Sequence, residues 1–465
     1  MAADTIEEAE SSTGEDTRLH RDWTRGSILR NLLSLSWPMI ITNTLTMLGP
    51  TIDMIWVGKL GSASIAGVGV AGMAVMVVNS ARMGLTTGTR AMIARFIGAD
   101  DARGANHVAQ QTIVVSAAFS IFMAIIGISL AEPIMRIMGV EADVVAEGAA
   151  YMRIMFVGSV AMSFRMMNES IMQASGDSVT PMRIAIAFRI FHVALCPFLV
   201  FGWWIFPRLG VSGAALTNVI SQSLGVGLGL WVLCGGRSRL RLSFRGFDLD
   251  WNIVWRIVRI GIPASVTGIE RSFANLVLMW FIVPFGTFAV ASHTVVDRVS
   301  QFLHMPSMGL GQGAGVLAGQ NLGARQPGRA ERTGWLAAGL FSAIMIISSI
   351  LVFFFAGNIV RIFNAEPGLV KIASTFLRIE IVAFLVFGLV VVLSQCLNGV
   401  GDTVIPMLTT LLTMWLVQVP LAYFLPRITG LGVYGVRWAI VSAIVMRAVI
   451  YTTYFRSGRW KRKRV

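Results

Sequence analysis

Residues 176–182 read GDSVTPM and residues 401–407 read GDTVIPM, so one short motif returns after 225 residues. Each copy stands between two long apolar stretches. Other residues keep the same offset: Pro38 and Pro263, Gly61 and Gly286, Ala66 and Ala291, Gly98-Ala99 and Gly323-Ala324, Arg136 and Arg361, Glu141 and Glu366, Arg153 and Arg378. A fixed register over so many positions predicts a chain built from two copies of one structure.

The composition predicts that both copies lie in a lipid bilayer. The 465 residues are 55% hydrophobic and only 13% charged, whereas soluble domains carry about 25% charged residues. The net charge is +14, and the positively charged residues cluster between the apolar stretches, as in the loops of membrane proteins. We therefore expect a multi-pass protein of the cell membrane, with lipid and no nucleic acid among its partners.

Apolar runs near 20 residues long predict transmembrane helices. We place twelve, at 33–57, 62–88, 108–131, 150–174, 181–206, 210–234, 254–283, 288–318, 334–357, 372–398, 404–426 and 430–455. Six spans in each half return the chain to the side from which it started. The fold class is therefore all-α and polytopic, with two parallel six-helix repeats around a central cleft.

The boundaries follow from the same pattern. We expect a disordered tail at 1–31, a first lobe at 32–235, a basic linker at 236–253, a second lobe at 254–455 and a basic tail at 456–465. Arginines and lysines gather on one side of the spans, which predicts that both termini are cytoplasmic. The Gly-Asp motifs mark turns, with Pro181 and Pro406 expected at the first position of the next helix.

Several motifs resemble the multidrug and toxic compound extrusion (MATE) family. They are LSLSWP at 33–38, PTID at 50–53, VGKLG at 57–61, RFIGAD at 95–100, QASGD at 173–177 and LGVSGAA at 209–215. The resemblance covers roughly residues 30 to 455, but lipid-linked oligosaccharide flippases of the same superfamily share the architecture. It implies export of organic, often cationic, compounds in exchange for protons or sodium ions.

Asp53 is the first candidate for the coupling site. It lies fifteen residues after Pro38, or about 22 Å along the first helix. A carboxylate in an apolar cleft binds a proton more readily than one in water, because burial disfavours the charged form. The alternative is an aspartate solvated at the helix end, but the resemblance matches Asp53 to a functional aspartate of the family.

The fifth predicted helix departs from the family pattern. The resemblance implies an Asn and an Asp four residues apart, where this chain has His192 and Cys196, and a hydroxyl residue where it has Asn218. His192 could replace the missing acid as a proton carrier, since imidazole titrates near pH 6.5. It could also be an ordinary hydrogen-bonded histidine. Asn168 on the fourth helix is a weaker polar candidate.

In the second half, Glu270 lies seven residues after Pro263. The resemblance implies a sodium site from a glutamate near this position and an aspartate on the tenth helix, but residues 384–391 offer no carboxylate. A hard cation prefers several oxygen ligands, so protons are favoured over sodium as the coupling ion. Glu270 could instead be a structural partner of an arginine such as Arg298.

Methionine and aromatic side chains could line an adaptable passage for organic cations. Met47, Trp280 and Met305 are the residues that we select from the many available.

The rival functions differ in the charge that they need. A flippase for a polyprenyl-linked sugar would need basic residues to hold a diphosphate, and arginines are present at 82, 165, 189, 271 and 298. No HExxH motif or nucleotide loop is found, so an enzyme is disfavoured. We expect a monomeric antiporter without a cofactor, and the flippase is the alternative.

Overall fold

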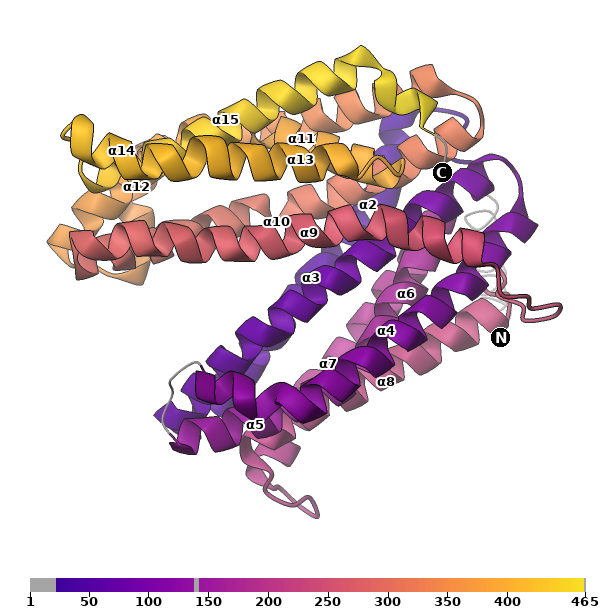
Figure 1. Ribbon diagram of the computed structural model, residues 1–465, viewed down its shortest axis with the longest axis horizontal. Helices are drawn as coiled ribbons and strands as arrows, with labels where there is room; N and C mark the ends of the chain where they lie inside the picture. The colour runs from indigo at the N-terminus through magenta and orange to yellow at the C-terminus, as the bar shows by residue number, and fades with distance from the viewer. Residues whose placement is uncertain (1–21, 138–141, 464–465) are drawn as a thin grey trace, which may run out of the picture.

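The computed structural model describes residues 22–137 and 142–463, and no strand occurs among them. The acidic residues from Asp4 to Asp16, the repeat residue Glu141 and the last two residues of the basic tail lie outside this range. The described chain is helical almost throughout (Figure 1).

The first half crosses the molecule six times. Its helices are α2 (Ile28–Val57), α3 (Ser62–Gly98), α4 (Ala102–Ile137), α5 (Ala142–Val157), α6 (Ser159–Ser175), α7 (Val179–Phe201) and α8 (Gly210–Cys234). Helices α5 and α6 form one passage that bends by 44° at Gly158. The single span predicted at 150–174 is therefore a bent pair of helices.

The second half repeats this order. Its elements are α9 (Trp251–Ile282), η1 (Val283–Phe285), α10 (Thr287–Gly323), α11 (Pro327–Phe363), α12 (Pro367–Gly399), α13 (Val404–Leu412), η2 (Thr413–Gln418), α14 (Val419–Ile428), α15 (Val433–Ser457) and η3 (Arg459–Arg462). The π-helical turn η2 joins α13 to α14 in one passage. Counted this way, the described residues make twelve passages, as predicted.

These helices suit a bilayer as their solvent. Ten of them are long and apolar enough to cross a membrane, and the bent pair makes an eleventh. Many of their large apolar side chains point outward, such as Ile347 at 62% and Phe354 at 71% exposure. Such surfaces are stable in lipid and not in water. The protein is a multi-pass membrane protein.

The two halves converge at the end where both termini lie and splay apart at the other (Figure 1). We call these the closed end and the splayed end. At the closed end Gly98 of α3 packs so tightly that a Cβ there would lie 1.9 Å from the Gln320 carbonyl oxygen of α10. Arg95 of α3 also donates to the carbonyl oxygen of Val400, at 3.1 Å.

Helix α2 belongs to both halves. Leu32, Leu35 and Met39 at its start lie in the apolar core of the second half. Val57 at its end lies in a core of the first half. Between these ends the helix contains Pro38 and Pro50. A change in the packing of α2 in one half can therefore alter its packing in the other half.

The repeated motif makes the same turn twice. Gly176 has φ +102° and Gly401 has φ +87°, a backbone conformation that favours glycine. The placing of the prolines was wrong by two residues, because α7 begins at Val179 and α13 at Val404. Pro181 and Pro406 are thus third in their helices, where the backbone N–H of any residue would also lack an intrahelical partner.

Candidate functional site

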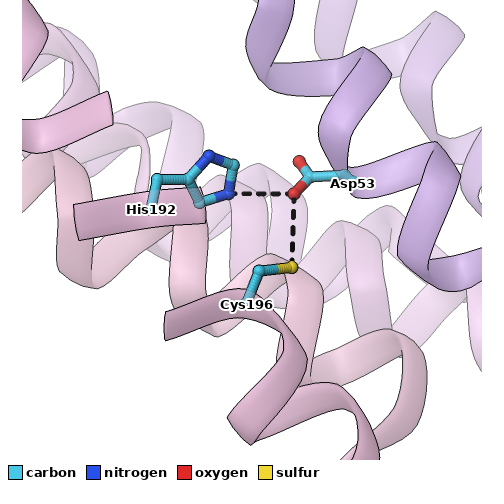
Figure 2. Close-up of side chains that lie close together, drawn as sticks. All are labelled: Asp53, His192 and Cys196. Carbon is cyan, nitrogen blue, oxygen red and sulfur yellow. Dashed lines mark hydrogen bonds and ion pairs between the residues drawn. The ribbon is translucent and has the colours of Figure 1, made fainter. Parts of the chain in front are cut away.

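Asp53 lies near the splayed end of α2 and is 1% exposed. It is one turn after Pro50, and its side chain points towards His192 and Cys196 of α7 (Figure 2). A buried carboxylate needs hydrogen-bond donors or a positive partner to remain charged. The residues around it show how that need is met.

Three side chains donate to the Asp53 carboxylate. His192 Nε2 lies 2.9 Å from Oδ1, and Cys196 Sγ lies 4.0 Å from the same oxygen (Figure 2). Asn218 Nδ2 of α8 reaches the other oxygen, Oδ2, at 3.4 Å. His192 and Cys196 are fully buried and stand one turn apart on α7. The structure thus brings together Asp53, His192 and Asn218, which the sequence named separately.

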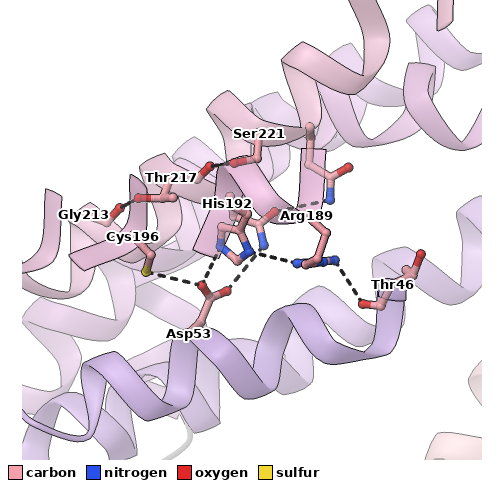
Figure 3. Close-up of polar contacts among 10 residues, drawn as sticks. Thr46, Asp53, Arg189, His192, Cys196, Gly213, Thr217 and Ser221 are labelled. Carbon is pink, nitrogen blue, oxygen red and sulfur yellow. Dashed lines mark hydrogen bonds and ion pairs between the residues drawn. The ribbon is translucent and has the colours of Figure 1, made fainter. Parts of the chain in front are cut away.

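Arg189 completes the cluster. Its Nη1 lies 2.9 Å from His192 Nδ1, and its Nη2 lies 3.4 Å from the Thr46 carbonyl oxygen (Figure 3). A guanidinium can only donate, so Nδ1 of His192 must accept. The imidazole is then neutral, with its proton on Nε2, from which it donates to Asp53. We call Asp53, Arg189, His192, Cys196 and Asn218 the Asp53 cluster.

The local sequence explains this geometry. Arg189, His192 and Cys196 are spaced three and four residues apart, which places them on one face of α7. On α8, Thr217 and Ser221 donate to carbonyl oxygens of their own helix, each at 2.7 Å. Asn218, which lies between them in the sequence, faces Asp53. From the sequence, Arg189 was a candidate only for a flippase. Its spacing of three residues from His192 could have indicated that both side chains lie on the same face of the helix.

The cluster also has the donor set of a transition-metal site. Ligand atoms of Asp53, His192 and Cys196 all lie within 4.8 Å of one another, and Zn²⁺ accepts oxygen, nitrogen and sulfur ligands. A ligating imidazole, however, normally donates from its second nitrogen, whereas here that nitrogen accepts from a cation. Sodium fits no better, since the groups facing the carboxylate are donors and not oxygens.

The other predicted residues lie apart from this cluster. Asn168 of α6 is buried, and its Nδ2 donates to the Val226 carbonyl oxygen at 3.4 Å. Glu270 of α9 is 7% exposed, and neither of its carboxylate oxygens has a hydrogen-bond partner among the described residues. The cations that act on Glu270 are Arg447 and Arg271, and not Arg298.

The three side chains chosen for a passage lie on three different helices. Met47 of α2 is 48% exposed and Trp280 of α9 is 71% exposed. Met305 of α10 is half-buried. A role in lining a passage for substrate stays a prediction.

Comparison with known proteins gives consistent results. A family model described as MatE matches residues 38–198 and 263–424, one stretch in each half. The Bacillus subtilis protein "Probable multidrug resistance protein YoeA" is 26% identical over 459 residues, covering 97% of this chain and 98% of the relative. A "FAD transporter" of Shewanella oneidensis is 24% identical over 399 residues, covering 84% and 87%.

Solved structures show the same architecture. A crystal structure of MATE in the bent conformation matches with a TM-score of 0.89 at 24% identity, covering 94% of this chain and 96% of that chain. At this level of identity the match establishes the fold.

Proposed function

The chain belongs to the MatE family of membrane transporters, and from this we propose that it exports organic, often cationic, compounds in exchange for protons. The family is one of transporters and not of enzymes. The observation that carries the proposal is the fully buried chain of contacts from Arg189 through His192 to Asp53.

Asp53 is the proton carrier in this mechanism. While ionised, it is balanced by the Arg189 guanidinium through a neutral imidazole, so the cluster has no net charge. When a proton binds the carboxylate, the attraction that holds α2 against α7 is lost and Arg189 is left without its counter-charge. Coulombic attraction is strong in a poorly hydrated interior, so protonation changes the packing of α2 substantially.

Helix α2 would pass this change to the other half, because its start packs in the core of that half. Lobes 32–235 and 254–455 would then rock about the closed end, as in other transporters with repeated halves. In this scheme His192 links the Arg189 guanidinium to the Asp53 carboxylate and orients that carboxylate. Asn218 holds the second carboxylate oxygen. Glu270 would serve as counter-ion to Arg447, and Asn168 would tie α6 to α8.

We also propose that both termini, and therefore the closed end, face the cytoplasm. Arginines and lysines concentrate in the loops and tails at that end, as the positive-inside rule requires. In this state the transporter would open outward. We further propose that one chain suffices for exchange, because both repeated halves are present in it.

The test uses inverted vesicles with an acidified lumen, to which ethidium is added. The unaltered protein should release the pH gradient as ethidium enters. Asp53→Asn should reduce this exchange to background, and Asp248→Asn, which alters an exposed aspartate of the linker, should leave it unchanged. Full exchange by the Asp53→Asn protein would remove the proposed mechanism.

A flippase for a polyprenyl-linked sugar is the second candidate, favoured by buried arginines in the first half. Arg82, Arg165 and Arg189 are each at most 5% exposed, and intramembrane cations suit a phosphorylated substrate. Arg165 already has a carboxylate partner, since its Nη1 lies 2.7 Å from Glu169 Oε2. Translocation of a diphosphate-linked lipid across vesicles, with no exchange of ethidium for protons, would favour this candidate.

A further inference from the structure

A second group of buried charges lies in the other half of the molecule. Arg437 of α15 is 1% exposed and reaches two other helices. Its Nη2 donates to the carbonyl oxygen of His293 at 3.1 Å and to Asp297 Oδ1 at 3.2 Å, both on α10. Its Nη1 lies 3.5 Å from Glu380 Oε2 of α12. We call His293, Asp297, Glu380 and Arg437 the Arg437 cluster.

The charges of the Arg437 cluster do not balance. Two carboxylates share one guanidinium, so the cluster carries one excess negative charge while His293 is neutral. Glu380 is 4% exposed, so a second negative charge beside it is unfavourable. The charged groups that act on Glu380 are Arg437 and Asp297, and the same two act on His293. No further cation among the described residues restores the balance.

One bound proton would restore it, and the carboxylates are its natural site. His293 Nε2 lies 3.3 Å from Asp297 Oδ2, but the other ring nitrogen, Nδ1, is buried with no partner among the described residues. A second N–H on that ring would be unsatisfied and would add a cation beside Arg437. Two carboxylates at one site instead favour protonation of one of them.

Asp297 is the more accessible of the two carboxylates. Its side chain is 40% exposed, whereas that of Glu380 is 6% exposed. A proton can thus arrive at the exposed carboxylate and be shared with the buried one. Glu270 differs from this pair, because the charged groups that act on it are two arginines, Arg447 and Arg271, and not a second carboxylate.

We propose that the Arg437 cluster is a second proton-binding site, at which Asp297 and Glu380 share one exchangeable proton. The transporter then takes up two protons for each exported molecule, one on Asp53 and one on this cluster. The stoichiometry rests on the proposed antiport, whereas the proton site itself does not.

The stoichiometry is tested in proteoliposomes with the membrane potential clamped at zero. The ethidium ratio across the membrane is measured at equilibrium for a series of pH differences. Its logarithm should rise with a slope of two per pH unit for the unaltered protein and a slope of one for Glu380→Gln. The control is Glu132→Gln, since Glu132 is an exposed carboxylate that Arg136 and Arg153 also hold, at 2.7 and 3.1 Å. It should keep a slope of two.

A slope of one in the unaltered protein, or a slope of two in both Glu380→Gln and Asp297→Asn, would overturn the proposal. An infrared titration of the purified protein tests the proton site without transport. The Asp53→Asn protein should retain a titrating band of a protonated carboxyl group, and adding Glu380→Gln should remove it. Absence of that band from Asp53→Asn would overturn the second site, even if ethidium exchange were intact.

Discussion

Each half brings together an arginine, a histidine and an aspartate, but the two halves connect them differently. In the Asp53 cluster the groups lie in series, with a neutral imidazole between guanidinium and carboxylate. In the Arg437 cluster the guanidinium contacts Asp297 directly and approaches Glu380 as well. The first cluster is balanced while its acid is ionised, and the second is balanced only with a proton bound. The two clusters therefore differ in charge because the second contains one carboxylate more than the first.

Neither cluster is a copy of the other in the repeat. At the offset of 225 residues, Asp53 corresponds to Leu278, His192 to Val417 and Asn218 to Ala443. In the other direction, Asp297 corresponds to Gly72, Glu380 to Met155 and Arg437 to Ser212. The helices and turns are duplicated, whereas the intramembrane charges are specific to each half.

The largest expected effect is a loss of stability when the Arg437 cluster loses its cation. Arg437→Met leaves the buried Glu380 and the half-buried Asp297 without their cation, and losing one partner of a buried charged group costs about 3–5 kcal/mol. Thermal unfolding in detergent should show this loss at neutral pH and a partial recovery in acid, where both carboxylates are protonated. Arg427→Met, at an exposed arginine over the ring of Tyr423, should change little. Equal stability of the two variants would refute the charge count.

Removing the cation of the first half should change pH dependence more than stability. In Arg189→Met the Asp53 carboxylate loses a nearby positive charge and binds a proton more readily. The midpoint of the exchange activity should move upward by about 1–2 pH units, the size expected for one charge in a partly hydrated interior. Arg189→Lys keeps the charge and should restore most of the profile. An unchanged pH profile in Arg189→Met would show that Arg189 is only structural.

At the closed end the two halves should respond alike, unlike the two clusters. A Cβ at Gly98 would meet the Gln320 carbonyl oxygen at 1.9 Å, and one at Gly323 would meet the Arg95 carbonyl oxygen at 2.1 Å. Overpacking of this kind costs about 1–3 kcal/mol, so Gly98→Ala and Gly323→Ala should slow ethidium exchange to similar extents.

Gly328→Ala is the control for this pair, because a Cβ at Gly328 meets nothing within 4 Å. A strong effect of only one of the two substitutions would show that the closed end is not symmetric in function.

The smallest expected effect is at the repeated Gly-Asp turns. Burial raises the pKa of the Asp177 carboxyl, although hydrogen bonds from Thr180 and Ser238 oppose the shift. A carboxyl whose pKa is raised in the folded state favours folding in acid and loses that contribution as the pH rises through the folded pKa. Asp177→Asn should therefore unfold at a slightly higher temperature at neutral pH.

Asp402→Asn at the matching turn should have the opposite effect. Asp402 accepts from Tyr454 at 2.6 Å and pairs with Lys463 at 3.3 Å, so the substitution removes an ion pair. Thermal unfolding of both variants over a pH series compares the two turns, and a change in the same direction would contradict this account.

The fold was largely predictable. Hydropathy and the 225-residue offset indicated two six-span halves, because a span needs only a run of apolar residues and a repeat needs only matching positions. The bend at Gly158 and the π-helical turn at Thr413–Gln418 were not predicted. They depend on how neighbouring helices pack and leave no clear pattern in composition.

The candidate site was only partly predictable. Asp53, His192 and Asn218 could be named because they are polar residues in apolar spans, at positions to which the resemblance to the MATE family points. Their contact could not be derived, since His192 is 139 residues from Asp53 along the chain. Glu380 was not a candidate, because an acid was expected within residues 384–391. The residues next to Arg437 in the sequence do not indicate its partners.

By itself the sequence determined the solvent of this protein, its helices and its duplication, because these depend on local composition and on order along the chain. Only the tertiary structure decided which cation stands beside which acid. The charge of a buried group is set by the few atoms within hydrogen-bonding reach, and those atoms come from helices far apart in the chain.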